Sequence, residues 1–139
     1  MLECSVIILN WNGEAMLRRY LPSVIQYTQL EGVEIVVADN GSTDASLEFL
    51  HSQPVRIIEL GENLGFAEGY NRAIEQVESK YVVLLNSDVE VTSNWLDTLL
   101  NYARAHEEVV AIQPKILSWH SKEDAIKSGS SEVLFEHAG

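Results

Sequence analysis

Three short polar segments of this sequence hold the residues best suited to chemistry. Each follows a short apolar run, and the three are Asn10–Gly13, Asp39–Asp44 and Asn86–Asp88. The ring of Trp11 can pack on a nucleotide base, and the carboxylate of Asp39 can accept a hydrogen bond from a base N–H or a ribose hydroxyl. The carboxylate of Asp88 can hold a hard divalent cation that neutralises a diphosphate. Together these residues favour a nucleotide as the ligand.

Each of these three residues also has a purely structural interpretation. Trp11 can be a hydrophobic plug at the edge of a sheet, and Asp39 can be a turn or helix-cap residue. For Asp88 the structural alternative is to cap the next helix. Thr92 and Ser93 are better placed for that cap, because they stand immediately before the next helical pattern. We therefore favour a functional carboxylate at Asp88.

Strand-like segments precede the three polar loops. Short apolar runs rich in β-branched residues predict buried strands, and these runs are Cys4–Leu9, Val33–Ala38, Val55–Leu60 and Tyr81–Leu85. The run Tyr81–Leu85 is uninterrupted and predicts a strand buried on both faces. The run Val55–Leu60 alternates enough to favour a position nearer an edge. A fifth strand is expected at Val109–Ile112 and a weak one at Glu132–Phe135.

Helical patterns fill the connections between these runs. Pro22 is expected to interrupt the first of them, so that Glu14–Arg19 forms a turn or two and a second helix starts at the proline. The other expected helices are Ala45–His51, Phe66–Val77 and Asn94–Ala105. Strands that alternate with helices predict parallel βαβ units with right-handed crossovers. In such a sheet the carboxyl ends of the strands meet at one edge, so Trp11, Asp39 and Asp88 are expected to converge.

A glycine-bearing loop, Gly61–Gly69, precedes the third helix. It lacks both the GxGxxG spacing and the Lys-Ser/Thr pair of the known phosphate loops. Gly65 and Gly69 either let the backbone approach a ligand or let the helix pack closely on the sheet. Arg72, one turn into that helix, can reach a phosphate or a base, and the alternative is an ordinary surface arginine.

Composition limits the remaining classes of function. The chain has 139 residues, enough for one domain with a core, and a net charge of −12, which argues against nucleic acid as a partner. No apolar run approaches the length of a transmembrane segment, and no signal peptide is recognisable. The single cysteine, Cys4, is expected to be a core residue in a reducing compartment, which indicates the cytoplasm. The four histidines have no ligand-like spacing.

Four segments, in order and spacing, resemble family 2 glycosyltransferases with the GT-A fold, and most closely their rhamnosyltransferase-like branch. The segments are VIILNWNG, EIVVADNGSTDAS, ENLGFAEGYNRAI and YVVLLNSDVEV, within Ser5–Ile116. The resemblance implies an α/β, GT-A-like (Rossmann-like) fold with a mainly parallel sheet flanked by helices. It also implies inverting, metal-assisted transfer of a sugar from a nucleotide-diphosphate sugar to an acceptor hydroxyl, in polysaccharide or cell-envelope glycan synthesis. The implied metal is Mg²⁺ or Mn²⁺, and the implied acceptor is a glycan or a lipid-linked molecule.

The resemblance also assigns roles to residues near the base. Asn10 and Trp11 fall where the family's first loop lines the base, and Asp39 falls on the acid that contacts it. The loop and helix start that border the nucleotide in the family correspond here to Asn63, Gly65 and the pair Asn71-Arg72.

The DXD motif of the family corresponds to Asn86-Ser87-Asp88. Its last acid, here Asp88, contacts the divalent metal and through it the diphosphate. Asn86 replaces the first aspartate of the motif. One carboxylate fewer predicts weaker metal binding before the diphosphate arrives.

The resemblance divides the chain into a nucleotide-sugar-binding domain, residues 1–116, and a polar tail, residues 117–139, at the start of an acceptor-binding half. In the family that half supplies the acidic general base. No feature places the late acids within reach of an acceptor hydroxyl, so no catalytic residue is assigned; these acids are Glu123, Asp124, Glu132 and Glu136. The chain alone is expected to be inactive, and the alternative is a non-catalytic nucleotide-binding or interaction module. Self-association as a homo-oligomer and peripheral membrane association are further expectations.

Overall fold

The computed structural model describes residues 1–114 and 136–137 of the protein. It divides into two compact units, residues 1–92 and residues 93–139, which are described separately. The first unit contains every residue to which the sequence assigned a site role. The predicted tail, residues 117–139, lies outside the described residues except for 136 and 137.

The first unit is a four-stranded parallel sheet with three helices. Its strands are β1 (Leu2–Asn10), β2 (Val33–Asp39), β3 (Arg56–Glu59) and β4 (Ser79–Leu85). Its helices are α1 (Glu14–Tyr27), α2 (Ser46–His51) and α3 (Phe66–Ile74). The strand order is β3-β2-β1-β4, so β3 lies at an edge as its alternating sequence predicts. Parallel pairing of all four strands confirms the βαβ interpretation of the alternating pattern.

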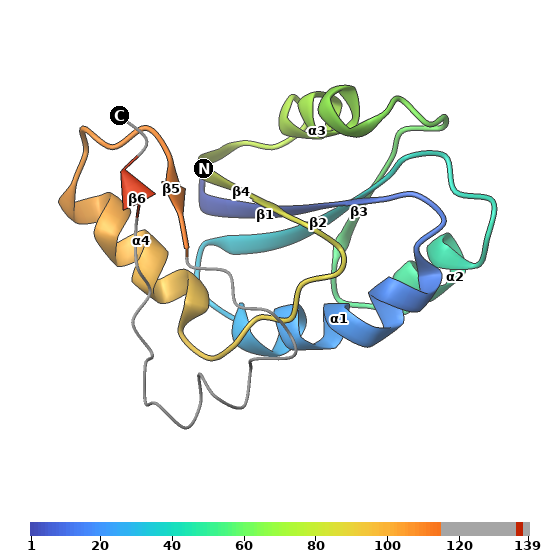
Figure 1. Cartoon of the computed structure of the whole chain (residues 1–139), viewed down its shortest axis with the longest axis horizontal. Coiled ribbons are helices and arrows are strands. Elements are labelled where there is room, and N and C mark those ends of the chain that lie inside the picture. The colour runs from blue at the N-terminus through green and yellow to red at the C-terminus, as the bar shows by residue number, and fades with distance from the viewer. Residues whose placement is uncertain (115–135, 138–139) are drawn as a thin grey trace. The chain divides into compact units, whose positions relative to one another are not determined.

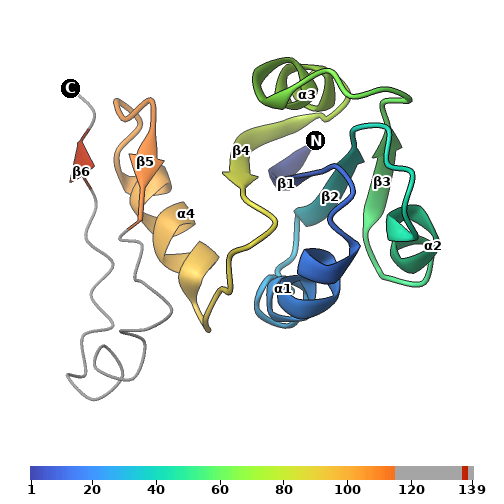
Figure 2. The same cartoon turned by 45° about the vertical axis from the view of Figure 1, so that its right-hand side comes forward.

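The helices cover both faces of this sheet. Figures 1 and 2 show α3 on one face and α1 with α2 on the other. Under α3 lies a buried apolar cluster made by alternate strand residues and two residues of the helix: Ile7, Val36, Ala38, Ile58, Tyr70 and Ala73. The side chains of Val6 and Ile8 point to the opposite face, because neighbouring strand residues alternate. This two-sided core fixes the strand ends that carry the polar loops.

The prediction that Pro22 interrupts the first helix is wrong, since α1 runs without a break from Glu14 to Tyr27 with the proline inside it. A proline within a helix removes one hydrogen bond and costs about 3 kcal/mol. Leu17, Leu21 and Val24 of the same helix are buried, and each such side chain contributes about 1.5–3 kcal/mol. Burial of the apolar face therefore outweighs the cost of the proline.

The prediction that Tyr81–Leu85 is buried on both faces is also wrong. β4 pairs with β1 and has no second neighbour among the described residues. Val82 and Leu84, which are level with Ser5 and Ile7 of β1, are 38% and 52% exposed. The sequence run is apolar enough for a central strand, but the described part of the chain supplies no element to cover its outer side.

The second unit consists of α4 (Trp95–Ala105) and a two-stranded antiparallel sheet of β5 (Ile112–Gln113) and β6 (Glu136–His137). The fifth strand is shorter than the predicted Val109–Ile112 and begins at its last residue. The weak strand predicted at Glu132–Phe135 lies outside the described residues. Within residues 1–114 and 136–137, no helix is both long and apolar enough to cross a membrane.

Neither Thr92 nor Ser93 caps α4. The helix begins after Asn94, which has a left-handed backbone and makes no capping hydrogen bond with its side chain. Asp88 stands six positions before Asn94, so it does not cap the helix either. The interpretation of Asp88 as a helix cap is therefore not supported. The prediction that Thr92 or Ser93 caps the helix is wrong as well.

The buried thiol of Cys4 gives a first testable prediction. Its side chain is fully buried in β1, and burial, together with the negative charge of Glu3, raises the pKa of the thiol to about 11. Because the thiolate is the reactive form, alkylation by iodoacetamide near neutral pH is expected to be at least about 100-fold slower in the folded protein than in the urea-unfolded chain. Mass spectrometry of timed samples measures both rates, and equal rates would contradict the burial of Cys4.

Candidate functional site

The loops that follow β1, β2 and β4 lie at the same edge of the sheet. Asn10, the last residue of β1, is the register partner of Asp39, the last residue of β2. On the other side of β1, Ile8 is the partner of Leu85, the last residue of β4. The predicted convergence of the three polar loops at one edge therefore follows from the observed register. All of these residues belong to the first unit.

Asp39 is the centre of a hydrogen-bond network at this edge. Its side chain is 2% exposed, and its Oδ1 accepts from Asn10 Nδ2 at 3.0 Å and from Ser42 Oγ at 2.6 Å. Its Oδ2 accepts from the backbone N–H of Ser42 at 3.0 Å. A carboxylate offers about four acceptor positions, so these hydrogen bonds leave one position on Oδ2 unused. Asp39 therefore does act as a turn residue, since it binds the N–H and the hydroxyl of Ser42, three positions further on.

Asn10 is buried beside Asp39 with one polar atom unpaired. The side chain is 1% exposed, and its Oδ1 has no hydrogen-bond partner among the described residues. A Cβ at Gly13 would lie 2.6 Å from that oxygen, so only glycine leaves it room. A buried acceptor without a donor costs about 1–3 kcal/mol. Such an atom is a natural partner for an N–H group of a ligand.

Trp11 lies between two residues that hold the first loop in place. Its indole is 54% exposed, so it does not act as a buried hydrophobic plug. The next residue, Asn12, has a positive φ of 48° and binds the second loop through both its side chain and its backbone N–H. An exposed ring on a fixed backbone is available to stack on a flat ligand.

Asn40 joins the second loop to the loop that precedes α3. It is buried, its Nδ2 donates to Asn63 Oδ1 at 3.2 Å and to the carbonyl of Gly65 at 3.1 Å, and its Oδ1 accepts from the N–H of Leu64 at 2.9 Å. The structure therefore brings Asn63 and Gly65 next to the Asp39 segment. Their predicted contact with a nucleotide stays a prediction.

The two glycines of the α3 region have different roles. Gly69 is the close-packing residue, because a Cβ there would lie 2.9 Å from Leu9 Cδ1 and 3.2 Å from Asn40 Nδ2. Gly65 has open space around it but adopts φ 81° and ψ −179°, a conformation that essentially only glycine reaches. Of the roles that the sequence left open, Gly69 therefore lets the helix pack closely on the sheet, and Gly65 allows the backbone conformation at the start of the helix.

Arg72 is held on the surface of α3 by acidic neighbours. Its Nε lies 2.8 Å from Glu68 Oε1, and its Nη1 lies 3.7 Å from Glu75 Oε2. The three side chains are about half exposed or more, so the pairs contribute little to stability. The surface interpretation fits this arrangement, and contact with a nucleotide stays a prediction for both Arg72 and its neighbour Asn71.

The Asn86–Asp88 segment is anchored on both sides. On one side, the hydroxyl of Tyr70, a buried residue of α3, donates to the carbonyl of Leu85 at 3.0 Å. On the other side, the N–H of Val91 donates to Ser23 Oγ at 3.2 Å. Asn86 and Asp88 are exposed between these anchors, and Ser87 is half-buried. The exposed carboxylate is therefore presented on a loop whose two ends are fixed.

The described residues contain no group of three or more His, Cys, Asp or Glu side chains that could hold a metal ion. Asp88 alone, with the oxygens of Asn86 and Ser87 as its neighbours in sequence, is an incomplete set of ligands. Mg²⁺ commonly uses one or two carboxylates and completes its shell with water and substrate phosphates. The residues present therefore fit a cation that binds together with a diphosphate, and they do not fit a permanent protein-only metal site.

Three residues of this edge were not singled out from the sequence, namely Asn12, Asn40 and Ser42. Each is a small polar residue within three positions of a strand end, where such side chains often bind nearby backbone groups. That signal was available within NWNG and DNGSTD. The sequence does not show the hydrogen-bond partners of these residues in other loops, which lie 23 to 32 residues away in the chain.

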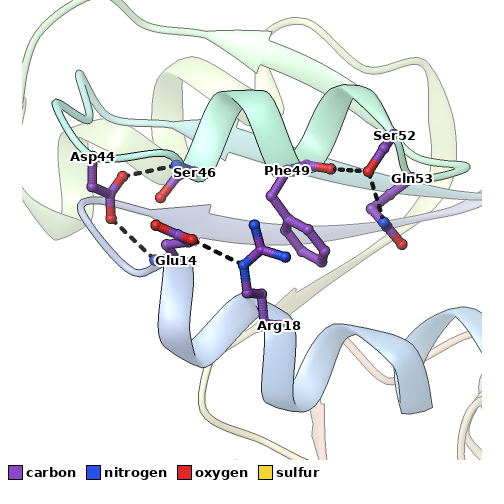
Figure 3. A network of polar contacts seen from close by, with 7 residues as sticks. All are labelled: Glu14, Arg18, Asp44, Ser46, Phe49, Ser52 and Gln53. Atoms are coloured by element: carbon purple, nitrogen blue, oxygen red, sulfur yellow. Dashed lines mark hydrogen bonds and ion pairs between the residues drawn. The ribbon is translucent and has the colours of Figure 1, made fainter.

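A second polar network ties α1 to α2 next to the site (Figure 3). Asp44 Oδ2 accepts from the N–H of Glu14 at 3.2 Å, and its Oδ1 accepts from the N–H of Ser46 at 3.0 Å. Arg18 binds Glu14 Oε2 through Nε at 2.9 Å and places its guanidinium 4.6 Å from the centre of the Phe49 ring. Since Glu14 is the first residue of α1, Asp44 satisfies one of the open N–H groups at that helix end.

The carboxylate of Asp44 gives a testable dependence of stability on pH. Desolvation acts to raise the pKa of this exposed carboxyl, but hydrogen bonds from Ser46, from the Glu14 N–H and from its own backbone outweigh it, so the pKa falls below the ordinary value of 3.8. A lowered pKa in the folded state means stability that is present above pH 3.8 and is lost as the pH falls through the lower folded value.

For Asp44→Asn we therefore expect a lower urea midpoint than wild type at neutral pH, and a difference that shrinks as the pH falls below 3.8. Tryptophan fluorescence in urea, repeated across this range, measures both midpoints. Glu48→Gln, an exposed change of equal charge near the start of α2, is the matched control. A difference that does not change with pH would contradict the assigned role of the Asp44 carboxylate.

Comparison with known proteins identifies similar sequences. Residues 5–129 match the sequence family described as Glycosyl transferase family 2. An uncharacterized glycosyltransferase of Bacillus subtilis is 32% identical over 110 residues, which cover 76% of this chain and 27% of the relative. An N-acetylglucosaminyl-diphospho-decaprenol L-rhamnosyltransferase of Mycobacterium tuberculosis is 29% identical over 124 residues, which cover 80% of this chain and 40% of the relative. The chain spans less than half the length of either protein.

Solved structures share the fold. S. aureus TarS 1-349 in complex with UDP-GlcNAc matches with a TM-score of 0.69 and 24% identity, over 76% of this chain and 32% of that chain. The mannosyltransferase PcManGT from Pyrobaculum calidifontis, in complex with GDP-Man and Mn²⁺, matches with a TM-score of 0.68 and 20% identity, over 89% of this chain and 38% of that chain. At these identities the likeness concerns the fold, and it confirms the GT-A-like prediction.

Proposed function

The chain belongs to glycosyl transferase family 2, and from this premise we propose that it forms the donor-binding part of a sugar-transferring enzyme. The donor is a nucleotide-diphosphate sugar, and the acceptor is a hydroxyl group of a glycan or a lipid-linked molecule. Transfer proceeds with inversion at the sugar and with the help of a divalent cation. The similarity to a rhamnosyltransferase that acts on a decaprenol-linked sugar supports a role in polysaccharide or cell-envelope glycan synthesis.

The observation that carries this proposal is the pair Asn10 and Asp39 beside an exposed Trp11. Asn10 Oδ1 is a buried acceptor without a donor among the described residues, and Asp39 Oδ2 has capacity for one more hydrogen bond. Two adjacent acceptors suit the N–H groups on the edge of a base, while the indole ring suits its face. Asn63 and Gly65, connected to this edge through Asn40, border the ribose side.

Asp88 is the residue that would hold the divalent cation, Mg²⁺ or Mn²⁺, together with oxygens of the donor. When bound, the cation would supply positive charge next to the diphosphate that leaves. Asn86 in place of a second carboxylate makes binding of the cation dependent on the nucleotide. Arg72 contributes to the diphosphate side if the nucleotide displaces Glu68 and Glu75 from its guanidinium.

In the proposed reaction the oxygen of the acceptor hydroxyl forms a bond to the anomeric carbon as the bond from that carbon to the diphosphate breaks. The proton of the hydroxyl passes to a general base, to which we assign no residue. Asn10, Trp11 and Asp39 hold the base of the donor and so orient the sugar toward the acceptor. The cytoplasmic location, the peripheral membrane association and the self-association stay predictions.

The competing hypothesis is a nucleotide-binding or interaction module without transfer activity. A nucleotide-binding module shares donor binding with the enzyme, an interaction module does not, and only the enzyme requires that the sugar leave the donor. The test is calorimetric titration of the chain with UDP, TDP and GDP, each with and without Mn²⁺. We expect one of the three to bind, and more tightly with Mn²⁺. Absence of binding to all three would overturn the proposed function.

A further inference from the structure

Asn12 connects the loop that carries Trp11 to the loop that follows β2. Its Oδ1 accepts from the N–H of Thr43 at 2.7 Å, from the N–H of Asp44 at 3.3 Å and from Thr43 Oγ1 at 3.4 Å. Its own N–H donates to Ser42 Oγ at 2.9 Å. One residue therefore makes four contacts to a segment 30 to 32 positions away in the chain.

These contacts fix the backbone on one side of Trp11, and Asn10 fixes it on the other. Asn10 donates to Asp39 Oδ1 at 3.0 Å and to Ser42 Oγ at 3.2 Å. Among the described residues, the indole of Trp11 takes part in none of the hydrogen bonds, ring contacts or cation–π contacts of the structure. The first loop thus has a constrained backbone and an exposed ring, an arrangement that lowers the entropy cost of binding a ligand on that ring.

The backbone conformation of Asn12 does not by itself require its side chain. A φ of 48° lies in the left-handed region, which glycine reaches as readily and aspartate also tolerates. A turn alone would therefore be served by glycine. What only a side-chain oxygen provides is the set of bonds to Thr43 and Asp44 across the two loops.

We propose that Asn12 is a positioning residue, which holds Trp11 against the base of the nucleotide and thereby contributes to the choice of base. This inference rests on the proposed function. Ser42 links the parts of the site, because its hydroxyl accepts from the Asn12 N–H and donates to Asp39. The Trp11 ring and the acceptor atoms of Asp39 are therefore held in a fixed position relative to each other.

Two substitutions separate the side chain from the backbone. Asn12→Gly keeps the left-handed turn and removes the side-chain bonds to Thr43 and Asp44. Asn12→Asp keeps the turn and an acceptor oxygen, so it is the matched conservative variant. Both are made in a background with Trp95→Phe and Trp119→Phe, which leaves Trp11 as the reporter among the three tryptophans of the chain.

The experiment measures Kd for UDP, TDP and GDP with Mn²⁺ by fluorescence of Trp11, and Kd for Mn²⁺ with inorganic pyrophosphate by calorimetry. For Asn12→Gly we expect about tenfold weaker binding of the preferred nucleotide, the size of one base–aromatic stacking contact. We also expect a smaller ratio between preferred and disfavoured nucleotides, with unchanged binding of pyrophosphate. Asn12→Asp should restore affinity and ratio close to the background protein.

The outcomes distinguish this inference from the proposed function. If the background protein binds no nucleotide, the proposed function fails and the inference fails with it. If that protein binds a nucleotide while Asn12→Gly keeps the same Kd and the same ratio between nucleotides, the inference alone is overturned. A lower urea midpoint for Asn12→Gly with unchanged nucleotide selectivity would show a purely structural role and would also overturn it.

Discussion

Asp88→Ala is expected to abolish the strengthening of nucleotide binding by Mn²⁺ while leaving the fold intact. Asp88 is exposed, so the substitution removes no buried contact. A carboxylate in contact with a cation at an effective dielectric constant near 20 contributes on the order of 4 kcal/mol. Because part of this is offset by lost hydration, we expect a loss of about 100-fold in the Mn²⁺-dependent affinity, or nearly 3 kcal/mol.

The control for this prediction is Glu90→Ala. Glu90 is an exposed carboxylate two positions further along the same loop, so its removal changes the net charge equally. Calorimetric titrations of wild type and both variants, with and without Mn²⁺, give the affinities. An equal loss in the two variants would mean that the cation responds to the general negative charge of the loop, and would contradict a specific role of Asp88.

Asp39→Ala is expected to have the largest effect on stability among single substitutions at the site. The change removes the acceptor of both donors of Ser42 and one of the two acceptors of the Asn10 side-chain amide, which keeps only Ser42 Oγ. Each buried donor without a partner costs about 1–3 kcal/mol. We expect a decrease of about 3 kcal/mol or more in the free energy of unfolding, measured by urea denaturation.

The matched variant is Asp39→Asn, which keeps one acceptor oxygen for Asn10 and the Ser42 hydroxyl. Its new amide group faces the N–H of Ser42, where Asp39 Oδ2 now accepts, so an intermediate loss is expected. Both variants should bind nucleotide more weakly than wild type under conditions where they are fully folded. A stability for Asp39→Ala equal to that of wild type would show that the network around Asp39 is not formed in solution.

The fold was predictable from sequence where the signal is local. Apolar runs and their spacing gave four parallel strands and their helices, because each strand is a continuous run and each connection has room for a helix. Pro22 misled because the cost of a proline is local, whereas the burial of Leu17, Leu21 and Val24 that offsets it depends on the whole sheet. Likewise, the run Tyr81–Leu85 cannot reveal whether a further strand lies beside it.

The site was predictable only in part for a related physical reason. Trp11, Asp39 and Asp88 could be named as candidates because a ring and two carboxylates stand at or near the carboxyl ends of predicted strands, where open α/β sheets bind ligands. The connecting residues are ordinary small polar side chains whose importance depends on partners in other loops. Asn12 and Asn40 act across 23 to 32 residues of chain, and only the register of β1 with β2 brings those loops together.

The central claim, a nucleotide with its cation at the carboxyl edge of the sheet, is tested most directly by paramagnetic broadening of amide NMR signals. Mn²⁺ is added to the labelled chain with and without the nucleotide that binds. We predict nucleotide-dependent broadening of residues 86–88, followed by 10–13 and 39–44, and sharp signals at the opposite edge of the sheet, where Arg56 and Ser79 begin their strands. Broadening at that opposite edge, or broadening that the nucleotide does not change, would contradict it.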